Sequence, residues 1–133
     1  MATKVTITQA FHFSAAHRLH TEQLSLEVNR QIFGKCNNLH GHGHNYTVFV
    51  TVCEDGASPL LRGELNRLVT ERIVRRFDHQ HLNYDPAFQD VVTTGENLAK
   101  LIWGLLVKEI PDRRLQKIGV LETRDNYFEY VGD

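Results

Sequence analysis

The sequence lacks most of the features that mark secreted, membrane-spanning or nucleic-acid-binding proteins. Its two cysteines, Cys36 and Cys53, lie in unlike contexts, a polar loop and the end of a strand pattern, and predict no disulfide framework. No apolar run approaches the roughly 20 residues of a membrane-spanning helix. The formal net charge is −1, from 15 basic and 16 acidic side chains, so neither nucleic acid nor an anionic membrane is an expected partner.

Targeting and low-complexity segments are absent from the sequence as well. The first residues, MATKVTITQ, contain no apolar core of a signal peptide and lead directly into a strand pattern, so we expect a cytoplasmic protein. No internal repeat or linker interrupts the chain. With 133 residues, 41% of them hydrophobic, residues 1–133 are expected to form a single domain around one core.

The most informative stretch is residues 34–52, GKCNNLHGHGHNYTVFVTV, in which a histidine-rich loop runs into a strand. Every second residue from Tyr46 to Val52 is apolar or aromatic, which is the period of a β-strand. The same register places His42 and His44 on one face, roughly 6–7 Å apart along the strand. Two imidazoles at that spacing can converge on one Zn²⁺, with bonds of about 2.0–2.1 Å.

His40 belongs to the same alternation and is a third candidate ligand. In an extended chain His40 and His44 would lie about 13 Å apart, too far to share a tetrahedral site. The expected arrangement is therefore one adjacent pair of histidines from this stretch and a third ligand from elsewhere. Three protein ligands with one open position are typical of a catalytic zinc site, whereas four are typical of a structural one.

The order of the remaining elements predicts an α+β fold. Strands are predicted over residues 4–13, 46–52, 117–122 and 127–131, with helices over residues 64–77 and after residue 93. Residues 20–35 are expected to be a long polar loop and residues 54–56 a turn. Thr93 and Glu96 resemble the N-cap and N3 positions of a capping box. This order predicts a four-stranded antiparallel sheet with two helices on one face (ββααββ).

Several motifs together carry a family resemblance. CNNLHGHGHNY at residues 36–46, FSAAHRL at residues 13–19 and FDHQHLN at residues 77–83 closely resemble segments of the 6-pyruvoyltetrahydropterin synthase and 6-carboxytetrahydropterin synthase family. The resemblance extends over residues 5–131. It implies the tunnelling fold, one Zn²⁺ per chain, and a homohexamer built as a dimer of trimers with active sites at subunit interfaces.

The resemblance also implies roles for individual residues. FSAAHRL matches the segment that supplies the third zinc histidine, so the implied metal set is His17, His42 and His44. Cys36, as thiolate, is the implied proton acceptor. Asp78 and His79 are the implied relay, in which a carboxylate orients an imidazole.

The substrate contacts implied by the resemblance lie in the last third of the chain. LETRDN resembles the segment whose glutamate holds the pterin ring, which assigns this role to Glu122, because a carboxylate can accept from the two neighbouring N–H donors of a pterin. Thr94 and Glu96 are implied further substrate contacts. Two residues depart from the family pattern: Asn83 stands where the family often has Asp, and Gly95 where some members carry Thr.

The implied reaction is that of a carbon–oxygen lyase. A pterin triphosphate, 7,8-dihydroneopterin triphosphate, would lose triphosphate with an internal redox change to give 6-pyruvoyltetrahydropterin, on the route to tetrahydrobiopterin. The other branch of the family releases acetaldehyde and leaves 6-carboxytetrahydropterin, on the route to queuosine. Five residues separate Cys36 from the pair at 42 and 44, as in the pyruvoyl branch, but a pair at 40 and 42 would match the carboxy branch. A non-catalytic zinc- or pterin-binding module is a third reading.

Overall fold

The computed structural model describes residues 5–54, 61–110 and 114–132. Its strands are β1 (Val5–His17), β2 (His42–Glu54), β3 (Gln80–His81), β4 (Leu115–Thr123) and β5 (Asn126–Tyr130). Its α-helices are α1 (Leu26–Phe33), α2 (Leu61–Val69), α3 (Arg75–Phe77) and α4 (Gly95–Val107). Single helical turns cover Gly34–Asn37, Leu82–Tyr84 and Pro86–Phe88, and a π-helical turn, Thr70–Val74, joins α2 to α3.

The strands form one sheet in the order β3-β1-β2-β4-β5. The α+β class predicted from the sequence is confirmed, but the predicted count of four strands is one too low, because β3 adds a fifth. β3 runs parallel to the end of β1, pairing Gln80 with Ala15 and His81 with Ala16. Two residues are too few to show a period in the sequence, and this explains why the strand was missed.

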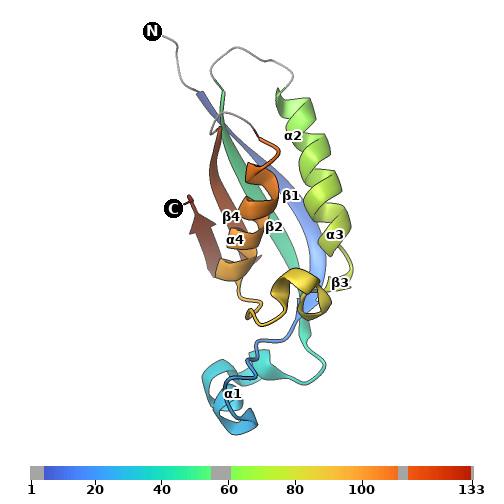
Figure 1. The fold of residues 1–133 in the computed structure, drawn as a ribbon, viewed down its shortest axis with the longest axis vertical. Helices are drawn as coiled ribbons and strands as arrows, with labels where there is room; N and C mark the ends of the chain where they lie inside the picture. The colour runs from blue at the N-terminus through green and yellow to red at the C-terminus, as the bar shows by residue number, and fades with distance from the viewer. Residues whose placement is uncertain (1–4, 55–60, 111–113, 133) are drawn as a thin grey trace.

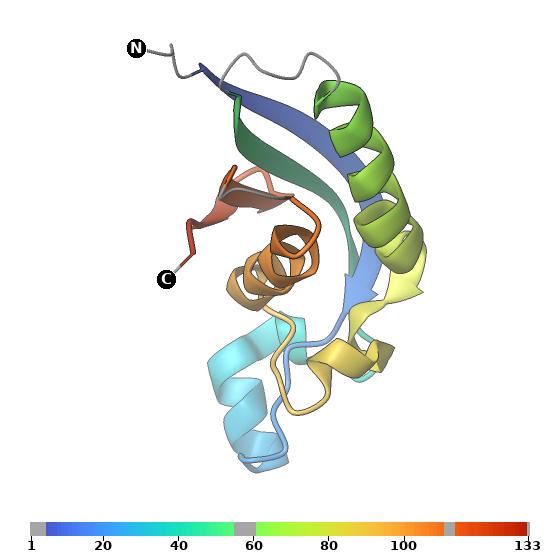
Figure 2. The same ribbon diagram turned by 45° about the horizontal axis from the view of Figure 1, so that its top comes forward.

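The helices cover a single face of this sheet, as predicted. Side chains on alternate positions of β1, β2 and β4 are buried, and they pack against buried side chains of α2, the π-helical turn and α4. Figure 2 shows the sheet curving around α4. Fully buried core residues such as Val48, Ile73 and Ile102 each contribute about 1.5–3 kcal/mol relative to exposure.

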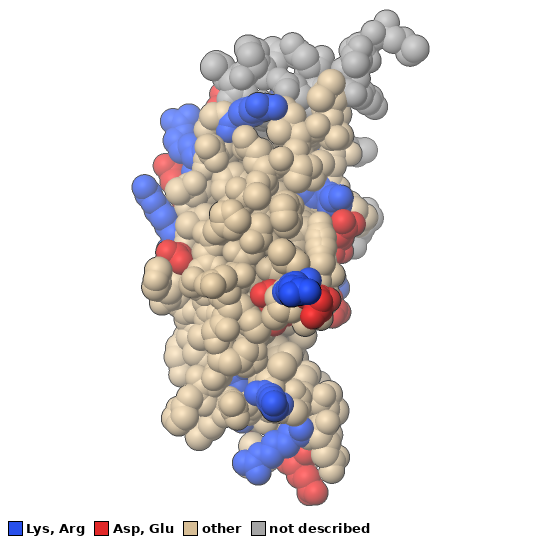
Figure 3. Space-filling model, turned by 180° about the vertical axis from the view of Figure 1, so that it is seen from behind, with Lys and Arg blue, Asp and Glu red and all other residues tan. Residues whose placement is uncertain are grey.

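The opposite face of the sheet, here called the outer face, carries polar side chains that pair between strands. Thr8 bonds Thr51 (2.7 Å), and the Ser14 hydroxyl donates to Asn45 Oδ1 (2.6 Å). Figure 3 views the molecule from this side and shows a surface on which charged side chains form only small groups, mostly toward its margins. No helix among the described residues covers this face.

β1 and β2 make the longest pairing in the sheet. Their antiparallel register is unbroken from Val5 opposite Glu54 to His17 opposite His42. The first strand therefore extends four residues beyond its predicted end at residue 13, as far as the histidine. The predicted turn at residues 54–56 lies almost entirely outside the described residues.

Two local predictions are corrected by the structure. Residues 20–35 contain helix α1, which Ser25 caps by accepting from Val28 N, and which lies at the end of the molecule opposite the start of β1 (Figure 1). Leu26 and Ile32 are both 60% exposed, so α1 lacks the buried apolar stripe that would reveal a helix. The N-cap of α4 is Thr94, which accepts from Asn97 N (3.2 Å), and not Thr93.

None of the helices in the described part of the chain is both long and apolar enough to cross a lipid bilayer.

Candidate metal centre and catalytic residues

Three histidines come together where β1 ends and β2 begins. His17 lies directly opposite His42, and His44 lies opposite Ala15, so all three side chains point to the core face of the sheet. The ring centroids are 4.6 Å apart for His17–His42, 4.6 Å for His42–His44 and 5.0 Å for His17–His44. The period-two spacing and the cross-strand register are sufficient to bring these rings together.

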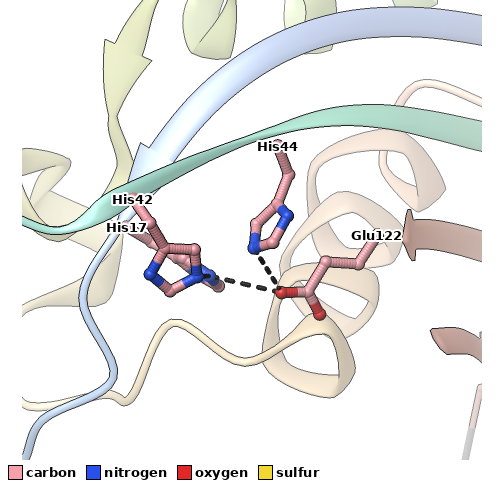
Figure 4. A group of neighbouring side chains, drawn as sticks. All are labelled: His17, His42, His44 and Glu122. Atoms are coloured by element: carbon pink, nitrogen blue, oxygen red, sulfur yellow. Dashed lines mark hydrogen bonds and ion pairs between the residues drawn. The ribbon is translucent and has the colours of Figure 1, made fainter. Parts of the chain in front are cut away.

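Glu122 joins the histidines from the end of β4 (Figure 4). Its Oε1 lies 3.2 Å from His17 Nε2 and 3.0 Å from His44 Nε2, and the side chain is 11% exposed. One donor atom from each of the four residues falls within 4.8 Å of the others. The resemblance assigned Glu122 to the pterin ring; the structure also places it beside the imidazoles.

The tautomer of His17 is set by the backbone. His17 is fully buried, and its Nδ1 donates to the carbonyl oxygen of Thr93 at 2.7 Å. The Tyr46 hydroxyl lies 3.4 Å from the same nitrogen. With the proton on Nδ1, the Nε2 lone pair points into the centre, which is the arrangement of a metal-binding histidine.

Nitrogen atoms at the centre face one another, or stay unpaired, in a way that a bound cation would resolve. The Nε2 atoms of His17 and His42 are 3.0 Å apart, so two lone pairs face each other unless a proton or cation lies between them. His44 Nε2 is buried and, although close to Glu122, makes no hydrogen bond. A cation bound by these nitrogens would satisfy both, so the residues present fit a metal ion.

The electrostatics of the centre favour neutral imidazoles at His42 and His44 and an ionised carboxylate at Glu122. Burial lowers the pKa of His42, reinforced by His17 and His44. Burial also lowers the pKa of His44, against the opposing effect of Glu122. The pKa of the Glu122 carboxyl is lowered, first of all by its contact with the His17 imidazole. Neutral imidazoles at His42 and His44 and an ionised carboxylate at Glu122 are the forms in which these three groups bind a metal.

His40 and Cys36 lie outside this group of four. His40 is exposed in the turn before β2, where Gly41 has φ +79° and any Cβ would lie 2.8 Å from His17 O. Cys36 lies in the helical turn Gly34–Asn37, half-buried, with its carbonyl accepting from Leu19 N at 2.7 Å. The structure thus distinguishes the pair at 42 and 44 from the pair at 40 and 42.

Asp78 and His79 form an ordered pair beside β1. Asp78 Oδ1 accepts from Ser14 N (2.9 Å), and Oδ2 lies 2.9 Å from His79 Nδ1. The Ser14 hydrogen bond lowers the pKa of Asp78, with a smaller contribution from His79. His79 has φ +61°, which is sparsely populated outside glycine, and its side chain is 82% exposed.

This pair opens onto the outer face, whereas the three clustered histidines point to the core face. The adjoining cavity, of about 460 Å³, is lined by outer-face residues such as Ser14 and Asn45 together with His79, and also by His44. Asp78 and His79, the predicted relay, are therefore in contact with each other, on the side of the sheet away from that to which the three imidazoles point.

The remaining predicted residues lie at the start of α4. The Thr94 hydroxyl caps the helix, and Glu96 is exposed in its first turn. At Gly95 a Cβ would overlap the ring of Phe128 on β5, which explains why this position is glycine.

Sequence reasoning missed two residues that contact the centre from behind, Thr93 and Tyr46. Thr93 contributes a backbone carbonyl, which leaves no signal in the sequence. Tyr46 continues the alternation of His42 and His44, so its position on their face was predictable although its contact with His17 was not.

Known proteins match this chain in sequence over nearly its whole length. The family model described as 6-pyruvoyl tetrahydropterin synthase matches residues 6–133. Human 6-pyruvoyl tetrahydrobiopterin synthase is 43% identical over 132 residues, covering 96% of this chain and 91% of the human protein. The Dictyostelium discoideum protein of the same name is 38% identical, with both chains covered completely.

A solved structure gives the same result for the fold. The 6-pyruvoyl tetrahydropterin synthase of Caenorhabditis elegans superposes with a TM-score of 0.90 at 35% identity, covering 98% of this chain and 97% of the other. Fold and sequence agree along nearly the whole chain, and this protein belongs to the 6-pyruvoyl tetrahydropterin synthase family.

Proposed function

We propose that this protein is a zinc-dependent lyase that converts 7,8-dihydroneopterin triphosphate to 6-pyruvoyltetrahydropterin with loss of triphosphate. The observation that carries the proposal is the convergence of four side chains where β1 ends and β2 begins: His17, His42, His44 and Glu122. The named relatives are 6-pyruvoyl tetrahydrobiopterin synthases, which supports the pyruvoyl product. The protein is proposed to act in the cytoplasm, as expected from the sequence.

The position of the histidine pair also supports the pyruvoyl branch. The converging pair is His42 and His44, so five residues separate Cys36 from the first of them, the longer of the two spacings. The shorter spacing would require His40, which is exposed and outside the group.

In the proposed site the three imidazoles hold Zn²⁺. The bound metal would supply Lewis acidity, lowering the pKa of the substrate's side-chain hydroxyls. His17 keeps its proton on Nδ1 through Thr93 O and so offers Nε2. Glu122, which is close to the metal position and mostly buried, accepts hydrogen bonds from the pterin ring and orients the substrate side chain toward the histidines.

Proton transfer is assigned to Cys36, Asp78 and His79. Cys36, as thiolate, accepts a proton from the substrate; Asp78 holds the Nδ1 proton of His79, which leaves Nε2 free to exchange protons. Thr94 and Glu96 border the substrate at the start of α4, with Thr94 also capping the helix.

The proposed assembly is a homohexamer, a dimer of trimers, with the active site shared between copies. Two features support this: the exposed Asp78–His79 pair opens away from the core face, and the charge-poor outer face is uncovered among the described residues. A neighbouring copy would bring its relay to the metal centre of this chain.

Product analysis tests the proposal. Purified protein loaded with zinc is incubated with 7,8-dihydroneopterin triphosphate, and the pterins and acetaldehyde are quantified by chromatography and mass spectrometry. We expect triphosphate and 6-pyruvoyltetrahydropterin. Acetaldehyde with 6-carboxytetrahydropterin would assign the chain to the other branch, and unchanged substrate would favour a binding module without catalysis.

A further inference from the structure

Two polar side chains behind His17, one buried and one half-buried, have no part in the reaction proposed above. The first is Thr93, which is 1% exposed and whose carbonyl accepts the Nδ1 proton of His17. Its hydroxyl lies 3.3 Å from Arg18 O and 3.2 Å from Asn83 Oδ1, and can donate to either. The hydroxyl has no capping duty, because Thr94 caps α4.

The second side chain is Asn83, which contacts Arg18 as a neighbouring strand would. Its Oδ1 accepts from Arg18 N at 2.8 Å, and its Nδ2 donates to Arg18 O at 2.8 Å. β3 pairs with β1 only at Ala15 and Ala16, so the Asn83 amide replaces the backbone partner that β3 no longer offers. An amide suits this role because it carries both a donor and an acceptor.

These contacts restrict His17 at two points, the backbone beside it and its imidazole ring. Asn83 holds the backbone of Arg18, the residue that follows His17 at the end of β1. Thr93 is linked through its hydroxyl to the same amide and carbonyl, and its own carbonyl orients the imidazole ring. Groups that hold the non-coordinating nitrogen of a metal-binding histidine set its tautomer and orientation.

We propose that Asn83 and Thr93 are positioning residues for His17, which together hold its Nε2 toward the metal. Neither residue is assigned a contact with substrate. The inference rests on the proposed function, because it presumes that His17 binds zinc.

The test compares zinc affinity among single variants, measured by competition with a chromophoric chelator. Removing a group that holds a metal ligand in place typically weakens metal binding 10–100-fold, and we expect a loss of this size for Asn83→Ala. Thr93→Val, which keeps the shape and the carbonyl, should weaken binding about tenfold. Asn83→Asp should weaken it less than Asn83→Ala, because a carboxylate still accepts from Arg18 N and the Thr93 hydroxyl.

Thr51→Val is the matched control. Thr51 is also buried, at 8% exposed, and its hydroxyl bonds Thr8 on the outer face. The control loses a comparable hydroxyl contact and should lower the melting temperature of the zinc-free protein about as much as Thr93→Val, but leave zinc affinity unchanged. The double variant Thr93→Val with Asn83→Ala should lose less than the product of the two single effects, since both act on one network.

A second readout is the visible absorption of the Co²⁺-substituted protein, which reports ligand geometry and should change in Thr93→Val but not in Thr51→Val. If the wild type binds zinc tightly and both Thr93→Val and Asn83→Ala bind it with the same affinity, this inference is overturned and the proposed function stands. A wild-type protein that binds no zinc would overturn the proposed function and this inference with it. If Asn83→Ala does not fold, Thr93→Val and Asn83→Asp decide the question.

Discussion

His17 and His42 face each other across the last pair of the β1–β2 ladder, with their Nε2 atoms 3.0 Å apart. Directly opposed residues of an antiparallel pair have Cβ atoms about 4.5–5.5 Å apart, so imidazoles there can meet over one atom. The ladder is 13 residue pairs long from Val5 to His17, which makes it a rigid base for the centre.

The first prediction is that the chain binds one zinc ion through His17, His42 and His44. Alanine at any of the three should reduce zinc content at micromolar metal to well below one per chain, because a coordinate bond is lost. His40→Ala is the control and should keep full occupancy, since His40 is exposed and outside the group. Metal content measured by mass spectrometry that falls in His40→Ala but not in His17→Ala would contradict the assignment.

The second prediction concerns the two thiols. Cys36→Ala should keep zinc and fold normally but lose about 10²–10⁴-fold in kcat, the usual contribution of a general base. Cys53→Ala should retain near wild-type turnover. Steady-state kinetics with the triphosphate substrate compares the two, and the reverse pattern would show that Cys53 is the reactive thiol.

The third prediction is that active sites combine residues of two chains. Cys36→Ala and His79→Ala should each be nearly inactive alone. When the two variants are unfolded, mixed and refolded together, some sites will receive Cys36 from one chain and His79 from the other, so activity should return to a substantial fraction of wild type.

A control for this experiment mixes Cys36→Ala with His42→Ala, both of which are assigned to the same side of the shared site. This mixture forms no complete site if a chain supplies its own thiol and imidazole, and it should stay inactive. Absence of recovery in the first mixture, with mixed oligomers shown by native mass spectrometry, would place the relay and the thiol in one chain.

The fourth prediction separates ring binding from metal binding at Glu122. Glu122→Gln keeps the shape but replaces one acceptor oxygen by a donor, so pterin affinity should fall by at least roughly 2 kcal/mol, the scale of a charge-assisted hydrogen bond. Zinc content should not change. Calorimetric titration with a pterin measures this, with the exposed Glu129→Gln as control. Loss of zinc in Glu122→Gln would instead identify Glu122 as a fourth ligand.

The fifth prediction concerns stability away from the site. Arg76 bonds Asp85 through two contacts, 2.9 Å from Nε to Oδ2 and 2.7 Å between Nη2 and Oδ1, and this pair lowers the pKa of Asp85. Arg76→Ala should therefore cost about 1–3 kcal/mol in unfolding free energy at neutral pH, whereas exposed Arg75→Ala should cost little.

The pH dependence of the Arg76–Asp85 pair follows from the direction in which the pKa of Asp85 is shifted. A carboxyl whose folded pKa lies below its unfolded value stabilises the fold above the unfolded pKa, and this contribution disappears as pH falls through the folded pKa. Urea unfolding at several pH values should show the difference between wild type and Arg76→Ala shrinking in acid. A constant difference would mean that Arg76 acts through packing on Phe77, over whose ring it lies.

The four longer strands were predictable from the sequence because their burial alternates locally, whereas β3 is too short to show a period. The period that placed Tyr46 and Val48 in the core also placed His42 and His44 on one face. Helix α1 was not predictable in the same way, since its buried residue is the polar Asn29 whereas Leu26 and Ile32 are exposed. A helix held mainly by capping and loop contacts gives a weak periodic signal.

The centre itself was only partly predictable. The histidines were found from spacing and motif, but the contact of Glu122 with them depends on the pairing of β2 with β4 and on a register shift between Leu121 and Thr123. Such long-range geometry is not encoded in a local pattern. The N-cap of α4 was predicted at Thr93, one residue before its actual position at Thr94, because either of two neighbouring threonines could cap the helix.

The pairing of His17 with His42 has one more consequence, for the segment between them. Residues 18–41 form a single excursion from the sheet whose two ends are these histidines, and it contains α1 and Cys36. A metal ion bound by both would close that excursion at its neck, as a disulfide would, and would reduce the entropy of its open forms. The ion would then do more than activate the substrate: it would tether the segment that carries Cys36, the proposed catalytic thiol.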